Sequence, residues 1–211
     1  MDKPVVALFD FDGTLTCNDT LPLYIRHATG WGGLALSMLS TLPSMIVLAC
    51  AGWKSVWGID AGSTKERLLR RCFAGRTIKE VATICHNFIP KVDAVLALPV
   101  VERMRWHKAQ GHKVVVVSAS VDVWVRPWCD AQGVDEVIAT RLQLDGNRYT
   151  GRFDGENCNG REKVNRIASH YSPADYHIVA YGNSSGDYPM FHYAHEAYLC
   201  TEGAIAPFHK L

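Results

Sequence analysis

The sequence lacks the features that mark a zinc-finger, disulfide-stapled or nucleic-acid-binding protein. Its seven cysteines form no Cys-x-x-Cys pair and are odd in number, so a reduced, intracellular thiol set is the simplest interpretation. The nine histidines show no His-x-x-x-His spacing of the kind that binds zinc. A formal net charge of +1 gives no electrostatic reason to expect a nucleic-acid partner.

Repeats and low-complexity tracts are also missing from the sequence, and no leader segment is expected. An apolar segment begins almost at the first residue and leaves no room for a signal peptide, so a cytoplasmic location is expected. With 211 residues, of which 48% are hydrophobic, the chain can bury a full core. This length predicts one domain, or one domain with an insertion.

The most informative segment is residues 5–16, where an apolar run with β-branched residues stops at two carboxylates, Asp10 and Asp12. If residues 5–9 form a buried parallel strand, the two carboxylates leave its carboxyl end with the same facing, because side chains alternate with a period of two. Open α/β sheets bind ligands at that end. Two like charges so close repel each other unless a cation or a proton lies between them, which implies a divalent metal.

Three further segments follow in the order expected of one enzyme family. Residues 10–14, Asp-Phe-Asp-Gly-Thr, resemble the first motif of the haloacid dehalogenase-like superfamily. Residues 114–118 are similar to its second motif, a strand that ends in a hydroxyl residue, and residues 160–164 to its third, in which a lysine opens a helix. Residues 178–187 resemble the fourth, a strand followed by a metal-binding loop. Four motifs in order make the resemblance specific.

The resemblance implies a phosphatase that works through an aspartyl-phosphate. Asp10 is then the nucleophile and Asp12 the general acid and base, roles that carboxylates fill in phosphoryl transfer. Ser118 and Lys163 would hold the phosphate oxygens, as positive and hydrogen-bonding groups do in such reactions. Backbone N–H groups near Gly13 and Ala119 would assist them.

The same resemblance implies Mg²⁺ as cofactor, held by Asp10, the Asp12 carbonyl and the fourth motif. The family usually has two acids four residues apart in that motif, whereas this chain has Asn183 and Asp187. An amide oxygen can still bind Mg²⁺, but the site loses one negative charge, so weaker metal binding is expected. Asp19 lies where phosphoserine phosphatases carry a glutamate that holds the substrate amino group, and its shorter side chain argues against serine phosphate.

Hydrophobic patterns predict an α/β fold, a Rossmann-like doubly wound parallel sheet with an inserted, mainly helical cap. Strands and helices alternate from residue 99 onward, apart from a hairpin at residues 142–153. Residues 17–98 contain helix-like segments and no convincing strand pair. The catalytic core is therefore assigned to residues 1–16 and 99–211, and the cap to residues 17–98. This arrangement resembles subfamily IB, which includes phosphoserine phosphatases and phosphatidylglycerophosphatase C.

The run from residue 28 to residue 53 has no formal charge and carries a tryptophan near each end. It is long enough to span a bilayer, yet a single span would separate Asp10 from Ser118. Two interpretations remain: cap helices packed together, or a segment that rests on a membrane surface. The first suits a small phosphorylated metabolite as substrate and the second a lipid phosphate.

Several alternatives stay open at the level of sequence. A phosphotransferase would pass the phosphoryl group from Asp10 to an alcohol instead of water, and Asn183 allows a catalytically weakened binding protein. Ser120 competes with Ser118 for the phosphate, and Arg161 and Lys113 compete with Lys163. The remaining conspicuous residues are interpreted as packing residues: Cys17 and Cys158 as small buried fillers, and Trp106, Trp124 and Trp128 as core or cap residues.

Overall fold

The computed structural model describes the backbone of residues 3–51 and 61–209, and the side chains of residues 3–36 and 65–209. By packing, the chain divides into two units. The first comprises residues 1–20, 85–141 and 155–211, and the second residues 21–84 and 142–154. All residues predicted to form the site belong to the first unit.

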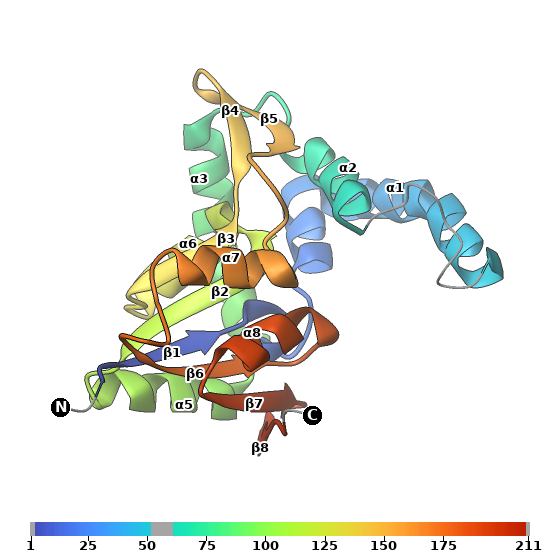
Figure 1. The fold of residues 1–211 in the computed structure, drawn as a ribbon. Coiled ribbons are helices and arrows are strands. Elements are labelled where there is room, and N and C mark those ends of the chain that lie inside the picture. Colours follow the sequence, from blue (N-terminus) through green and yellow to red (C-terminus); the bar gives the residue numbers. More distant parts are fainter. Residues whose placement is uncertain (1–2, 52–60, 210–211) are drawn as a thin grey trace. The chain divides into compact units, whose positions relative to one another are not determined.

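A six-stranded sheet forms the centre of the first unit (Figure 1). Its strands are β1 (Val5–Phe9), β2 (Lys113–Val121), β3 (Glu136–Thr140), β6 (His177–Gly182), β7 (Glu196–Thr201) and β8 (Ala204–Pro207). The order is β3-β2-β1-β6-β7-β8, with all neighbours parallel except β7 and β8. The predicted α/β fold is confirmed. The antiparallel strand β8 was not predicted, since it is only four residues long.

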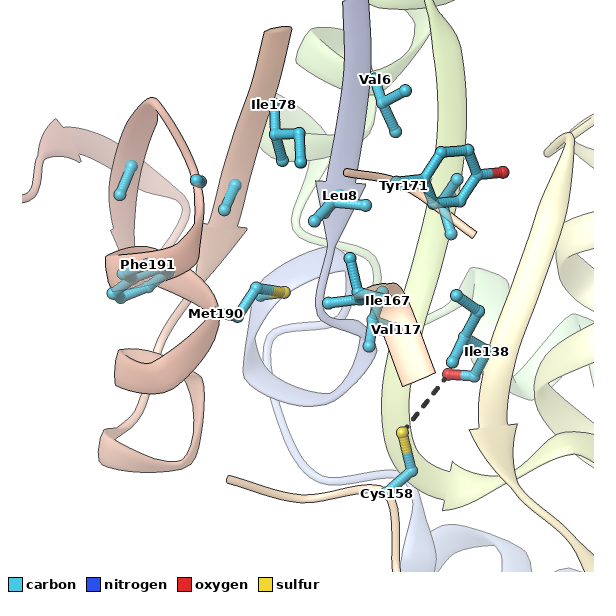
Figure 2. Packing of buried hydrophobic residues seen from close by; sticks show 14 residues of the cluster. Val6, Leu8, Val117, Ile138, Cys158, Ile167, Tyr171, Ile178, Met190 and Phe191 are labelled. Atoms are coloured by element: carbon cyan, nitrogen blue, oxygen red, sulfur yellow. Dashed lines mark hydrogen bonds between the residues drawn. The ribbon is translucent and has the colours of Figure 1, made fainter. Parts of the chain in front are cut away.

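The strands form here because their side chains are buried on both faces of the sheet. Val6 and Leu8 of β1 point into a cluster with Ile167, as Figure 2 shows, while Phe9 stacks on Tyr181 with ring centroids 4.4 Å apart. In Figure 1 helix α5 (Leu98–Ala109) covers one face, and α7 (Arg161–Ala168) and α8 (Tyr188–Tyr193) the other. The unit also contains α4 (Ile89–Asp93) and α6 (Asp122–Ala131). Such two-sided burial explains the near-continuous apolar runs of the strands.

The second unit combines helices with the hairpin. It contains α1 (Leu21–Ala51), which has a break at Gly30 (φ 73°), α2 (Ala61–Phe73), most of α3 (Ile78–His86), and the strands β4 (Leu142–Asp145) and β5 (Arg148–Phe153). Among the described residues from 17 to 98 no strand is formed, as the sequence predicts. By packing, residues 17–20 and 85–98 group with the sheet and the hairpin groups with α2. The boundary at 17–98 stays a prediction about domain organisation.

The uncharged run at residues 28–53 is described only in part. Its side chains from residue 37 onward and its backbone at residues 52 and 53 lie outside the described residues. Within the described portion Trp31 is 72% exposed and Leu36 is 56% exposed, and the Arg26 guanidinium lies 4.8 Å from the Trp31 ring centroid. In the part of the chain that the structure describes, no helix is long and apolar enough to cross a bilayer.

Two of the packing interpretations are wrong. Cys17 is exposed, because it lies in the loop after the first motif and not in the core, whereas Cys158 is buried as predicted. Trp106 is 47% exposed on the outer side of α5, where Arg103 lies over its ring. Trp124 and Trp128 are fully buried in the first unit.

Behind β1, a buried histidine joins helix α5 to the sheet. His107 is 3% exposed, and its ring nitrogens lie 2.8 Å from His112 Nδ1 and 2.9 Å from the Tyr181 hydroxyl. Burial, followed by the charges of His112 and Arg103, lowers the pKa of His107 from 6.5 to about 4, although Glu196 acts in the opposite direction. The folded protein therefore holds this imidazole neutral.

We expect His107 to weaken the fold in acid. Between about pH 6.5 and pH 4 the unfolded chain binds a proton at His107 that the folded chain does not, so stability falls as pH falls, by on the order of 2 kcal/mol. Urea unfolding at several pH values should show a shallower acid loss in His107→Gln than in the parent. The exposed His86→Gln is the control. Parallel pH profiles for the parent and His107→Gln would contradict the expectation.

Candidate active site

Three charged side chains meet where β1 and β6 end. Lys163 Nζ lies 2.6 Å from Asp10 Oδ1 and 2.6 Å from Asp187 Oδ1. Asp10 follows β1, Asp187 follows β6, and Lys163 stands in the first turn of α7. All three are buried, with exposed fractions of 6%, 0% and 2% for Asp10, Asp187 and Lys163. The structure thus brings together three of the predicted site residues from segments far apart in the sequence.

Burial makes the charge of Asp10 dependent on its neighbours. Burial, then the negative charge of Asp187, raise the pKa of Asp10 to about 7, against the opposing effect of Lys163. Burial lowers the pKa of Lys163, but the Asp10 and Asp187 carboxylates outweigh it and raise that pKa above its usual range. A cation beside Asp10 therefore favours its ionised form, which is the form that can attack phosphorus.

The loop after β6 holds Asp187 by its second oxygen. Asp187 Oδ2 accepts hydrogen bonds from the backbone N–H groups of Asn183 and Ser184, at 3.0 Å each, and from the Ser184 hydroxyl at 3.1 Å. Its other oxygen accepts from Lys163. The Asn183 side chain lies against Gly13: a Cβ added to Gly13 would come within 2.0 Å of the Asn183 amide nitrogen. Gly13, at φ 74°, therefore leaves the space that the Asn183 side chain occupies.

Asp12 reaches its place by a turn and not by strand alternation. Strand β1 ends at Phe9, and residues 11–15 form a tight turn in which Thr16 N–H donates to the Phe11 carbonyl at 3.0 Å. Asp12 Oδ1 accepts from the backbone N–H and the hydroxyl of Thr20, both at 2.7 Å. Asp12 Oδ2 accepts from the Ser120 hydroxyl. The carboxylates of Asp10 and Asp12 therefore have different partners, and their common facing stays a prediction.

Strand β2 does not end at Ser118 but continues to Val121 through an irregularity. Ser118 pairs with Ala139 of β3, and Val121 pairs with the next residue of β3, Thr140. Ala119 and Ser120 are therefore two extra residues of β2 between two consecutive pairs of the ladder. Such bulges redirect side chains at sheet ends. Ser118 Oγ accepts from Ser120 N–H at 3.0 Å, and Thr140 donates to the Ala119 carbonyl at 2.7 Å.

The competing residues lie elsewhere or have other partners. Lys113 is paired with Val6 at the amino end of β1, far along the strands from Asp10, and its ammonium lies over the Tyr171 ring. Arg161 is exposed at the start of α7. Ser120 is buried against Asp12. Asp19 is exposed beside Thr20, and its role in substrate selection stays a prediction.

Sequence reasoning missed the side chains that surround Asp12. Thr20 contacts Asp12 from eight residues away, and the Trp124 indole N–H donates to Thr20 Oγ1 at 3.2 Å. Nothing in their spacing signals these contacts, since they depend on the turn after β1 and on the packing of α6. From the sequence, the Ser120 hydroxyl is a rival of Ser118 for the phosphate, and its contact with Asp12 is not predicted.

The oxygen donors fit a hard divalent cation. Such ions prefer carboxylate, carbonyl and amide oxygens. Asp10 and the backbone of Asp12 stand at one strand end, and the Asn183 amide lies against the adjacent Gly13. Both oxygens of Asp187 already have protein donors, Lys163 on one and the loop backbone on the other. Among the described residues no group of three His, Cys, Asp or Glu side chains forms a metal cluster.

Comparison with known proteins establishes the family. Residues 7–192 match the model of the haloacid dehalogenase-like hydrolases, and the chain belongs to that family. It is 32% identical over 198 residues to Protein CicA of Caulobacter vibrioides, a match that covers 92% of this chain and 85% of CicA.

Solved structures show the same fold. A Bordetella pertussis protein of unknown function, 24% identical, has a TM-score of 0.76 over 92% of this chain and 89% of its own. Phosphoserine phosphatase, solved as a phospho-aspartyl intermediate analogue, is 23% identical, with a TM-score of 0.57 over 93% of this chain and 86% of its own. The fold is therefore that of the phosphoserine phosphatase-like members of the family.

Proposed function

We propose that the chain is a Mg²⁺-dependent phosphatase that hydrolyses phosphomonoesters through an aspartyl-phosphate on Asp10. One observation carries the proposal: the buried Lys163 ammonium bridges Asp10 and Asp187 at 2.6 Å each. This arrangement fixes the Asp10 carboxyl group and places positive charge beside it, at the sheet end where α/β proteins bind ligands. The second carboxylate, Asp12, lies two residues away with separate partners.

The reaction assigns each residue a step. An Asp10 oxygen forms a bond to phosphorus while the bond to the leaving oxygen breaks and Asp12 donates a proton to that oxygen. Asp12 then takes a proton from water, whose oxygen attacks phosphorus and releases Asp10. Lys163, the Ser118 hydroxyl and the backbone N–H groups near Gly13 and Ala119 would stabilise the phosphoryl oxygens.

Asp10, the Asp12 carbonyl and Asn183 would hold Mg²⁺, with Asp187 beside them. When bound, this ion neutralises charge on the phosphoryl group. Because Asp187 already has Lys163 and the loop as partners, we assign it mainly to fixing Lys163. The family relationship and the oxygen donors support this cofactor.

The substrate class is proposed as a small phosphorylated metabolite. A lipid phosphate is the second candidate, favoured by exposed Trp31 and Leu36 at the start of the uncharged run. The test is turnover on a panel of soluble and lipid phosphomonoesters, with Mg²⁺ and with a chelator, and cosedimentation with anionic vesicles. Preference for soluble esters without vesicle binding supports the first candidate. Preference for the lipid, with binding that Trp31→Glu abolishes, supports the second. Absence of turnover in all cases would leave a binding protein.

Asn183→Asp should strengthen Mg²⁺ binding. One more anionic ligand facing the cation is expected to raise the affinity by on the order of ten-fold, which corresponds to ~1.4 kcal/mol. Activity at limiting Mg²⁺ should rise with it, and a titration of activity and of heat against Mg²⁺ measures both. The exposed Asn165→Asp, on α7, is the control for added charge. Unchanged or weaker binding would remove Asn183 from the metal site.

A further inference from the structure

The carboxylate of Asp12 is held by three donors from two separate segments. Thr20 supplies its backbone N–H and its hydroxyl to Oδ1, both at 2.7 Å, and the Ser120 hydroxyl donates to Oδ2. Thr20 and Ser120 are fully buried. A carboxylate bound at both oxygens cannot rotate freely, so these contacts fix the plane of the group.

The donors are themselves fixed by buried neighbours. The indole N–H of Trp124, a fully buried residue of α6, donates to Thr20 Oγ1 at 3.2 Å. The backbone N–H of Ser120 donates to Ser118 Oγ at 3.0 Å. The bulge in β2 between Ser118 and Val121 allows Ser120 to face Asp12. A continuous chain of contacts therefore runs from the packed helix α6 to Asp12.

We propose that Thr20, Ser120 and Trp124 are positioning residues that aim the Asp12 carboxylate at the leaving oxygen. The inference rests on the proposed function, in which Asp12 donates a proton to that oxygen. The backbone N–H of Thr20 can only donate, so Oδ1 stays an acceptor. The Ser120 hydroxyl can both donate and accept, which leaves Oδ2 as the oxygen able to carry the proton.

In the first step, the proton moves from Asp12 Oδ2 to the leaving oxygen as the P–O bond breaks and the bond from Asp10 to phosphorus forms. In the second, Oδ2 takes a proton from the attacking water. None of the three positioning residues loses or gains an atom. Their contribution is to orient Asp12. Their loss should therefore impair proton donation to the leaving oxygen, without the general loss of turnover that removal of the nucleophile causes.

The test measures kcat/KM over a series of phosphate esters whose leaving groups differ in acidity. Alkyl phosphates need a proton donor at the leaving oxygen, whereas nitrophenyl phosphates do not. Thr20→Val, Ser120→Ala and Trp124→Phe should lose about 10- to 100-fold on an alkyl phosphate and little on a nitrophenyl phosphate, following the usual cost of losing such supporting contacts. Thr20→Ser, which retains the hydroxyl, should restore the parent values.

Trp128→Phe is the matched control for Trp124→Phe. It makes the same change on the same helix, but its indole donates to Asp93 at 2.9 Å and does not contact Thr20. It should leave the dependence on the leaving group unchanged. Circular dichroism and thermal unfolding of each variant record the fold.

Asp12→Asn separates this inference from the proposed function. If Asp12→Asn leaves the dependence on the leaving group as in the parent, Asp12 is not the acid and both ideas fail. A second outcome overturns only the positioning role. In it, Asp12→Asn makes kcat/KM depend more steeply on the leaving group, whereas Thr20→Val, Ser120→Ala and Trp124→Phe lose activity equally on all esters.

Discussion

Replacement of Asp10 by asparagine is expected to remove turnover, by on the order of 10⁴-fold or more, as the loss of a nucleophile does in other covalent enzymes. An amide of similar volume cannot form the acyl phosphate. The fold should persist, because Lys163 keeps its 2.6 Å ion pair with Asp187. Steady-state hydrolysis of a phosphomonoester and thermal unfolding measure the two effects. Asp175→Asn, an exposed carboxylate of the same unit, is the control.

Direct detection of the intermediate makes the same prediction sharper. Asp12→Asn should slow both the departure of the leaving group and the hydrolysis of the acyl phosphate, by the ~10²- to 10⁴-fold typical of a positioned acid or base. With a nitrophenyl phosphate, whose leaving group needs no proton, only the second step should slow, so the intermediate should accumulate. Acid quench and mass spectrometry should then find one phosphoryl group on Asp10. A phosphoryl group on another residue, or full activity of Asp10→Asn, would rule out covalent catalysis at Asp10.

Replacement of Lys163 by methionine is expected to cost both stability and activity. Its removal leaves Asp10 and Asp187 buried without their shared cation, a change that destabilises proteins by about 3 kcal/mol. Loss of the positive charge beside the phosphoryl oxygens should lower kcat by on the order of 10²-fold. Denaturant unfolding and steady-state kinetics measure these effects.

Two further variants test whether the stability lost in Lys163→Met comes from the unpaired buried carboxylates. Lys163→Met combined with Asp187→Asn should recover part of the lost stability, since one buried carboxylate is then neutral. The exposed Lys113→Met should change stability by about 0.5 kcal/mol or less. If the double variant were less stable than Lys163→Met alone, repulsion between Asp10 and Asp187 would not be the source of the loss.

The sequence was sufficient to predict the strand ends and the helix start that carry the charged residues of the site. The apolar run before Asp10 predicted β1. The motif around Lys163 predicted the start of a helix, which is α7, and the apolar run before Asn183 predicted a strand, which is β6. Parallel strands bring their carboxyl ends to one edge, so the meeting of Asp10, Lys163 and Asp187 follows from the order of the motifs.

The rest could not be predicted because it depends on turns and on tertiary packing. The turn after Phe9 ends the strand alternation and sends Asp12 toward Thr20. The bulge in β2 places Ser120, and no pattern of apolar residues signals a bulge. The burial of Trp124 against Thr20 needs the position of α6, which periodicity alone does not give.

The hairpin β4–β5 has a consequence for how this architecture can be recombined. Residues 85–141 of the first unit separate the hairpin from residues 21–84 along the chain. The hairpin nevertheless packs on α2, where a Cβ at Gly151 would come within 2.7 Å of the Arg70 Cα. Gly75 N–H also donates to the Tyr149 carbonyl at 2.9 Å. A chimaera that imports residues 21–84 from a relative must therefore import residues 142–154 as well, and a glycine at position 151 with them.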